Sequence, residues 1–249
     1  MKILVCISSV PDTTTKISFS NDNTEFNSTG VQFVINPNDE FGLTKALQIK
    51  ESNAGSTVTV IHVGPATNDP IIRKSLAIGA DDAVRIDTMA NDPIQVANEI
   101  ASYVKENPFD IIITGKESID YNSAVVPHAL GELLNIPSVS PCIGLEINGN
   151  EASLTGVVDG GKEDLSATLP VVLGGQKGLV EESELRIPNM RGIMQARSKP
   201  LHVIAASGTS TNQKVVNYDT PAKKAACKLV DANNVEELVS LLQNEAKVI

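Results

Sequence analysis

The sequence predicts an α/β fold: a doubly wound, mostly parallel sheet with a β-hairpin extension and a C-terminal arm. Strands rich in Val and Ile alternate with amphipathic helices at the spacing of βαβ units through about residue 135. Hydrophobic residues make up 41% of the 249-residue chain and aromatic residues only 3%, so the expected core is aliphatic. Aliphatic strands are typical of a parallel sheet that is buried on both faces.

The first part of the chain predicts a strand, a β-ribbon and a helix. The strand is expected at residues 3–7, and the ribbon at the strand-like runs 17–19 and 31–35. Asn36 is a candidate N-cap of the helix that follows. Pro37 suits its first position, because a proline there removes no helical hydrogen bond.

Three further pairs of strand and helix follow. Strands are expected at residues 57–63, 83–86 and 109–114. Asp69 and Asp92, each followed by proline, are candidate N-caps of two helices, and Gly79 suits the end of the first. The third helix has an apolar side that runs from Val126 to Leu134.

The second half of the chain has a different pattern. Residues 137–173 read as strands separated by turns, which predicts hairpins beside the sheet. Residues 178–232 are expected to be loop and extended arm, and 235–242 a closing helix. This pattern divides the chain into an α/β domain at 1–200 and a C-terminal arm at 201–249.

Composition argues against several classes of function. The formal net charge of -10 and the isoelectric point near 4.8 would repel phosphate backbones, so we expect no nucleic-acid partner. No apolar run approaches the length of a membrane span, so we expect no membrane insertion. Three widely spaced cysteines form no disulfide or zinc pattern, and we expect the chain in the reducing cytoplasm.

The stretch GKESIDYNSAVVPHALGELL, residues 115–134, is the main candidate site. In doubly wound sheets the ligand lies at the carboxyl ends of the strands, where the strand order reverses, and this stretch directly follows a strand. Pro127 is tolerated only in the first turn of a helix. The helix is therefore expected to begin between Tyr121 and Val126.

A helix that begins there leaves free amides around Asn122 to Val126. Free amides at the positive end of a helix bind phosphate without any lysine or glycine-rich fingerprint. A plainer interpretation is that Asn122 or Ser123 caps the helix over water. The residues alone leave both interpretations open.

A second segment, RIPNMRGIMQARSKPLH at residues 186–202, is basic and rich in methionine. It has four Arg and Lys residues and no acidic one, and it holds Met190 and Met194, two of the chain's four methionines. Adaptable Met beside Arg suits a surface that docks more than one partner. The alternative is a solvated loop whose two methionines lie in the core.

Five segments, taken in order, resemble the β subunit of electron-transfer flavoproteins. They are MKILVCISSVPD; VINPNDEFGLTKALQIKE; HVGPA with SLAIGADDAVRI; TGKESIDYNSAVVPHALGELL; and VVDGGKEDLSATLPVVLGG followed by IPNMRGIMQARSKPL. The resemblance implies a heterodimer in which the α subunit carries most of the FAD site and the β subunit binds AMP as a structural ligand. In flavin-bifurcating relatives a second FAD takes the place of AMP.

The resemblance also implies functional residues. The expected nucleotide contacts are Cys6, Asn36, Pro37, Asn38, Asp39, Val63, Asp120, Tyr121, Asn122, Ser123, Ala124, Val125 and Val126. The loop at about 184–200 would dock an acyl-CoA dehydrogenase or another flavoprotein dehydrogenase, and the arm would pack on the α subunit. The expected docking residues are Ile187, Met190, Arg191, Ile193 and Met194.

The chain departs from the family in its phosphate-binding run. Many relatives have a Gly-Asp-Thr-Ala-Gln-Val-Gly type of run where this chain has YNSAVVP. Tyr121 thus replaces a small residue, Val125 a glutamine and Pro127 a glycine. Side-chain hydrogen bonds and one amide are lost, which leaves AMP and FAD both open as the ligand of the remaining amides.

Two other functions would also suit an adenine-nucleotide site. An enzyme of the ATP-pyrophosphatase type needs a Ser-Gly-Gly-x-Asp loop after the first strand, whereas this chain has SSVPD at residues 8–12. A stand-alone adenine-nucleotide-binding module would have no use for the arm. His62 is expected in the core or at its edge, and the sequence offers no acid/base pair or partnered nucleophile, which favours an electron-carrier subunit without catalytic residues of its own.

Overall fold

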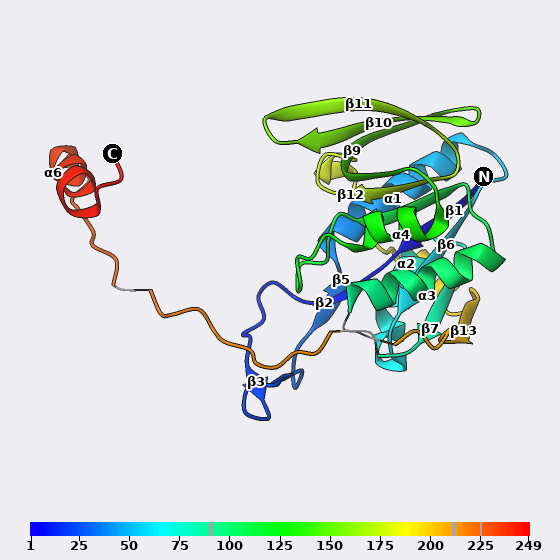
Figure 1. Ribbon diagram of the computed structural model, residues 1–249, viewed down its shortest axis with the longest axis horizontal. Helices are drawn as coiled ribbons and strands as arrows, with labels where there is room; N and C mark the ends of the chain where they lie inside the picture. The colour runs from blue at the N-terminus through cyan, green and yellow to red at the C-terminus, as the bar shows by residue number, and fades with distance from the viewer. Residues whose placement is uncertain (90–91, 211–212, 225) are drawn as a thin grey trace. The chain divides into compact units, whose positions relative to one another are not determined.

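The computed structural model describes residues 1–89, 92–210, 213–224 and 226–249. Within them the main sheet has nine strands in the order β11-β10-β9-β12-β8-β1-β6-β7-β13 (Figure 1). Its strands are β1 (Lys2–Cys6), β6 (Thr57–Val63), β7 (Asp82–Asp87), β8 (Ile111–Gly115), β9 (Ser138–Asn148), β10 (Glu151–Val158), β11 (Gly161–Thr168), β12 (Val171–Gly175) and β13 (Leu201–Ala205). All neighbours from β9 to β13 are parallel, and β10 and β11 add antiparallel pairs, which confirms the predicted fold class.

Helices cover both faces of this sheet. The helices are α1 (Pro37–Ser52), α2 (Asp69–Ile78), α3 (Pro93–Glu106), α4 (Val126–Leu134), α5 (Met190–Ala196) and α6 (Val235–Ser240), with short helical turns at Ala66–Asn68, Glu182–Glu184 and Leu241–Ala246. Helices α1 and α2 pack on one face, and α3 and α4 on the other (Figure 1). No helix among the described residues combines the length and apolar character needed to cross a bilayer.

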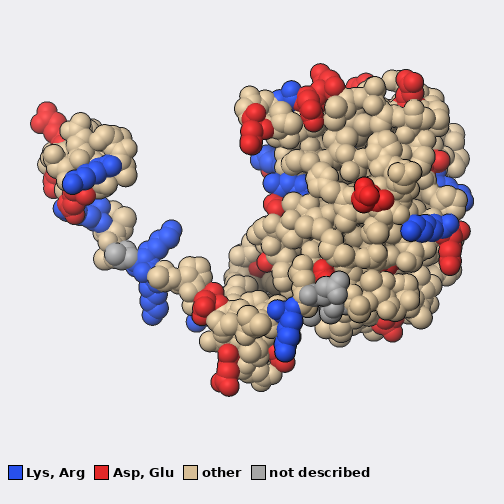
Figure 2. All heavy atoms as spheres, viewed as in Figure 1, with Lys and Arg blue, Asp and Glu red and all other residues tan. Residues whose placement is uncertain are grey.

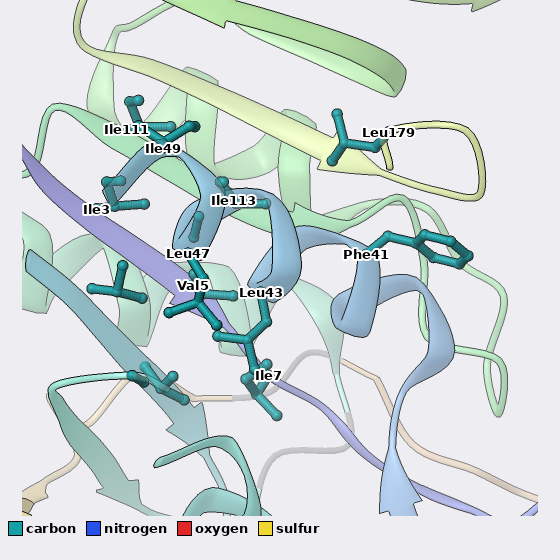
Figure 3. Packing of buried hydrophobic residues seen from close by; sticks show 14 of the residues in the cluster. Ile3, Val5, Ile7, Phe41, Leu43, Leu47, Ile49, Ile111, Ile113 and Leu179 are labelled. Carbon is teal, nitrogen blue, oxygen red and sulfur yellow. The ribbon is translucent and has the colours of Figure 1, made fainter. Parts of the chain in front are cut away.

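The two faces divide the core because successive residues of a strand point to opposite sides. Ile3 and Val5 of β1 pack in one cluster with Leu43 and Leu47 of α1 (Figure 3). Leu4, between them in sequence, packs in a second cluster with residues of α3 and α4. The strand is therefore buried on both faces, as its unbroken aliphatic run predicts.

The β-ribbon differs from the prediction. The runs at 17–19 and 31–35 both contain strand residues, but they do not pair with each other. β5 (Phe33–Ile35) pairs with β2 (Ser9–Pro11), and β3 (Phe19–Ser20) pairs with β4 (Glu25–Phe26). The backbone after β1 stays extended and forms β2, which pairs with β5. The prediction placed these residues in a loop.

The chain divides into two compact units. The larger comprises residues 1–18 and 27–215, and the smaller comprises 19–26 and 216–249. The predicted arm at 201–249 thus begins with a strand of the main sheet, β13, whose backbone pairs with β7. The segment expected to be loop and arm from residue 178 also contains α5. In the smaller unit the rings of Phe19 and Tyr218 stack with centroids 4.8 Å apart.

The predicted ends of the helices were right in part. Asp92 caps α3 by accepting a hydrogen bond from the amide of Ile94 at 2.9 Å, and Gly79 follows the last residue of α2. Asp69 is wrong as a cap, because it is the first residue of α2 and its side chain pairs with Arg85. The ion pair with Arg85 thus takes the place of a capping hydrogen bond to the backbone of α2.

Charged side chains are dispersed on the surface of the protein. Figure 2 shows acidic and basic side chains interspersed over the viewed face. With a net charge of -10, this distribution offers no positive field for a polyanion on that face.

Candidate nucleotide site at the carboxyl edge of the sheet

The strand order reverses at β1. From β1 the chain builds β6 and β7 on one side, and it then returns to build β8 and β12 on the other. In doubly wound proteins such a reversal marks the ligand-binding edge. The predicted nucleotide residues lie at this edge by topology, because they end β1 and β6, begin α1 and precede α4.

The carboxylate of Asp39 joins three elements at this edge, and its residue is only 2% exposed. Oδ2 accepts a hydrogen bond from the amide of Ser8, just after β1, at 2.7 Å. Oδ1 accepts from the amide of Gly115, the last residue of β8, at 2.8 Å and from Nδ2 of Asn36 at 2.9 Å. The first turn of α1 is thereby fixed to the ends of two central strands.

Two asparagines fix the base of the loop that follows β8. Nδ2 of Asn36 and Nδ2 of Asn38 both donate to the carbonyl of Glu117, at 2.9 and 3.0 Å. Oδ1 of Asn36 accepts from the amide of Ile119 at 3.3 Å. The predicted N-cap role of Asn36 is therefore wrong: the residue stands at the cap position, but its buried side chain serves the loop instead.

Gly115 lies where the strand end and the helix start approach most closely. A Cβ at this position would lie 2.3 Å from Oδ1 of Asp39 and 2.8 Å from Cβ of Asn38. Only glycine fits that space. Gly115 was not among the predicted site residues. A glycine at the end of an aliphatic strand often indicates that another part of the backbone approaches closely, and this pattern could have identified it.

Helix α4 begins at Val126, as Pro127 predicts. Val125 stands at its N-cap position, and no side chain caps the helix there. The plainer interpretation, in which Asn122 or Ser123 caps the helix, is therefore wrong. The orphan amides of this helix end need another partner.

The loop before α4 presents a run of unbonded amides. The amide of Asn122 donates to the carbonyl of Ser118 at 2.8 Å, so this amide is not free as predicted. No acceptor among the described residues lies within hydrogen-bonding distance and angle of the amides from Ser123 to Val126. Asn122 and Ala124 have φ values of 49° and 53°. Left-handed residues within a turn bring neighbouring amides into a concave arrangement that binds anions.

The turn after β6 is fixed by His62, which is buried as predicted. Its Nδ1 lies 2.7 Å from the carbonyl of Ile7 and must donate, so Nε2 accepts from Nδ2 of Asn68 at 2.9 Å. Burial lowers the pKa of His62, in agreement with a neutral ring. A Cβ at Gly64, the residue after Val63, would lie 2.3 Å from Nε2 of His62. This position therefore requires glycine, as position 115 does.

Arg85, a buried cation beside this turn, was not predicted from the sequence. Arg85 is 4% exposed, and its Nη1 donates to the carbonyl of Gly64 at 3.0 Å. Its guanidinium also pairs with Asp69 at 2.8 Å and with Asp87. An arginine inside an otherwise apolar strand, flanked by aspartates, is the signal that could have identified it.

The pKa of Asp39 gives a first testable prediction. Burial raises this pKa to about 7, against hydrogen bonds from Ser8, Asn36 and Gly115 that favour the charged form. The folded chain therefore holds the proton more tightly than the unfolded chain. The contribution of this group to the free energy of unfolding is fully present below about pH 4 and is lost as the pH rises toward 7.

We expect the unfolding free energy of the wild type, relative to that of Asp39→Asn, to fall by about 2 kcal/mol between about pH 5.5 and about pH 8. Urea titrations of both proteins at the two pH values measure this change. A difference that stays constant would show that Asp39 does not titrate in this range.

The basic, methionine-rich segment forms an exposed surface around α5. Ile187, Met190 and Met194 are 81%, 76% and 69% exposed, and Arg191 and Ile193 are exposed as well. The alternative in which both methionines lie in the core is therefore wrong. We call Ile187, Met190, Arg191, Ile193 and Met194 the α5 surface.

Two surface cavities of the described residues lie away from the nucleotide edge. One, of about 580 Å³, is lined by Lys45 of α1 and by residues of β9, β10 and β11. The other, of about 340 Å³, lies between the later part of α4 and the start of β9. Neither is lined by a residue predicted to contact the nucleotide, so the candidate site rests on the hydrogen-bonding geometry of the loop.

The fold and the site define a doubly wound α/β protein whose ligand edge adjoins an uncapped helix N-terminus. The family model described as "Electron transfer flavoprotein domain" matches residues 24–209. The chain therefore belongs to the electron transfer flavoprotein family, as its sequence resemblance predicts. The name of the family assigns its members to electron transfer.

Similar proteins carry the name of one subunit of this family. The chain is 36% identical over 234 residues to "Electron transfer flavoprotein subunit beta" of Bacillus subtilis, which covers 88% of this chain and 90% of that protein. It is 34% identical over 254 residues to the protein of the same name from Syntrophomonas wolfei, covering 100% and 98%. A protein of Oryza sativa subsp. japonica named "Electron transfer flavoprotein subunit beta, mitochondrial" is 31% identical over 259 residues, with 100% of both chains covered.

Proposed function

We propose that this chain is the β subunit of a heterodimeric electron-transfer flavoprotein and binds AMP through the loop before α4. It helps to seat the FAD that the α subunit mainly carries, and it docks acyl-CoA dehydrogenase or another flavoprotein dehydrogenase. When bound, FAD supplies the redox chemistry. The residues of this chain bind, orient and dock, and none acts as an acid, a base or a nucleophile.

One observation carries the nucleotide part of this proposal. The consecutive amides from Ser123 to Val126 have no acceptor among the described residues, and they lie at the edge where the strand order reverses. Amide donors at the positive end of a helix suit a phosphate. The loop base is held by Asn36 and Asp39, so these donors are pre-positioned. The direct nucleotide contacts carried over from the family remain predictions.

Mass spectrometry of the small molecules released from the denatured heterodimer tests the proposal. The chain is co-expressed with its α-type subunit, and we expect about one AMP and one FAD per heterodimer. Two FAD and no AMP would instead support the flavin-bifurcating form. A chain that never co-purifies with a flavin-bearing subunit would remove the electron-carrier role, and a stable homodimer with bound nucleotide would favour the stand-alone binding module.

A charge placed in the loop tests where the phosphate binds. Ser123→Asp is expected to weaken AMP binding at least about tenfold, since a carboxylate would face the phosphate, while the exposed position leaves the melting temperature nearly unchanged. Isothermal titration with AMP measures the affinity. Ser153→Asp, the same change at an exposed position of β10, is the control and should bind AMP as the wild type does. Equal affinities for all three proteins would exclude this loop.

We also propose that the protein works in the cytoplasm. Its cysteines are free thiols, and Cys6 and Cys142 are buried, which suits a reducing compartment.

A further inference from the structure

Helix α5 buries few of its own side chains, so side-chain burial contributes little to holding it in place. It has seven residues, and isolated helices of that length are unstable in water. Its large apolar side chains, Met190, Ile193 and Met194, are exposed, and Ala196 is the one buried residue within it. Something other than the hydrophobic effect on these side chains must fix α5 to the protein.

Two basic side chains supply that attachment: Arg73 of α2, and Lys199 in the turn that follows α5. Nη1 of Arg73, on α2, donates to the carbonyl of Ala196, the last residue of α5, at 2.8 Å and to that of Lys199, in the following turn, at 2.7 Å. In return, Nζ of Lys199 donates to the carbonyls of Leu76 and Ala80 at 2.9 and 2.6 Å, at the carboxyl end of α2. Each cation lies at the negative end of the other helix, where it is electrostatically favoured.

Backbone packing between the two helices agrees with this attachment. A Cβ at Gly192 would lie 2.2 Å from the carbonyl oxygen of Ala77, so α5 rests directly on the backbone of α2. Oδ1 of Asn189 caps the other end of α5 by accepting from the amide of Gly192 at 2.8 Å. The helix is thus held at both ends and at its middle, with the α5 surface left outside.

We propose that Arg73 and Lys199 are positioning residues that pre-organise α5 for docking of a flavoprotein dehydrogenase. This inference rests on the proposed docking function. A helix that is ordered before it docks loses less conformational entropy on binding, so the two residues strengthen docking through the order of α5. Neither residue belongs to the α5 surface itself.

Hydrogen exchange followed by mass spectrometry tests the attachment on the purified heterodimer. In Arg73→Met and Lys199→Met, the amides of residues 190–199 are expected to exchange at least about tenfold faster than in the wild type, with the main sheet unchanged. Gly192→Ala should have the same effect through backbone displacement, and it serves if either charge variant is poorly folded. Lys74→Met is the matched control, because this neighbouring lysine pairs with Glu40 on α1. Wild-type exchange rates in folded Arg73→Met and Lys199→Met would overturn the proposal.

Reduction of the heterodimer by an acyl-CoA dehydrogenase and its substrate tests the docking role. We expect Arg73→Met to raise KM for the heterodimer severalfold with kcat unchanged, and Arg73→Lys to restore part of the affinity because it keeps the charge. Faster exchange with an unchanged KM would also overturn the proposal, since the order of α5 would then make no difference to docking. Failure of the proposed function gives a different result: a wild-type heterodimer without flavin.

Discussion

Replacing Asp39 with alanine is expected to lower the free energy of unfolding by about 3 kcal/mol at about pH 6 and to release the nucleotide. The change leaves the amides of Ser8 and Gly115 and Nδ2 of Asn36 without their common acceptor. Each buried group left unsatisfied costs about 1–3 kcal/mol. Since burial raises the pKa of Asp39 to about 7, the carboxyl is mostly neutral at this pH, and relief of a buried charge offsets little of the loss.

The nucleotide effect follows from the same hydrogen bonds. Asp39 holds the end of β8, and its partner Asn36 holds residues 117–119, so the loop before α4 loses its fixed base in the variant. We expect AMP affinity to fall at least about tenfold, which corresponds to about 1.4 kcal/mol. Urea unfolding gives the stability, and titration calorimetry gives the affinity.

The neighbouring acidic residue of α1 supplies the control. Glu40 is only partly buried and pairs with Lys74 at 3.3 Å, so Glu40→Ala should cost less than about 1 kcal/mol. If Asp39→Ala were as stable as Glu40→Ala, the three donors would have other acceptors in the folded protein, and Asp39 would not organise the edge.

The central sheet could be predicted from the sequence because its strands are uniformly aliphatic. A strand buried on both faces needs apolar residues at every position, and this pattern is seen without knowledge of its partners. Strand β13 lacks such a pattern: of its five residues, His202, Val203 and Ala205 are exposed, and it is held by backbone pairing with β7. Pairing of this kind depends on which strand forms the edge of the rest of the sheet. A short stretch of sequence around β13 does not contain that information.

The start of the helix at the candidate site could be predicted from the sequence, but the contacts that hold the loop before it could not. Pro127 limits where α4 begins, and the structure starts the helix at Val126. The roles of Asn36 and Asp39 depend on residues about 80 positions away, Gly115 and Glu117, and such contacts leave no periodic signal. In the structure the side chains of Asn36 and Asp39 hold the loop. A direct contact by this segment stays a prediction.

Gly115→Ala is expected to lower the melting temperature by about 10 °C, although it adds a single methyl group. The methyl carbon would lie 2.3 Å from Oδ1 of Asp39, 2.8 Å from Cβ of Asn38 and 2.9 Å from Nδ2 of Asn36. Asp39 and Asn36 are buried, and their atoms are held by the hydrogen bonds that fix the edge, so neither can withdraw cheaply. Overpacking costs about 1–3 kcal/mol, and broken hydrogen bonds add to it; at about 3 kcal/mol, a chain of this size loses roughly 6–12 °C.

Differential scanning calorimetry measures the shift, and Gly161→Ala is the matched control. Both glycines lie in strands and neither has a positive φ, so alanine is tolerated by the backbone at both positions. A Cβ at Gly161 would have nothing within 4 Å, and its variant should melt within about 2 °C of the wild type. Comparable melting temperatures for Gly115→Ala and Gly161→Ala would mean that α1 and β8 can separate at no cost. The loop before α4 would then have no rigid support, and its amides could not be pre-positioned for a phosphate.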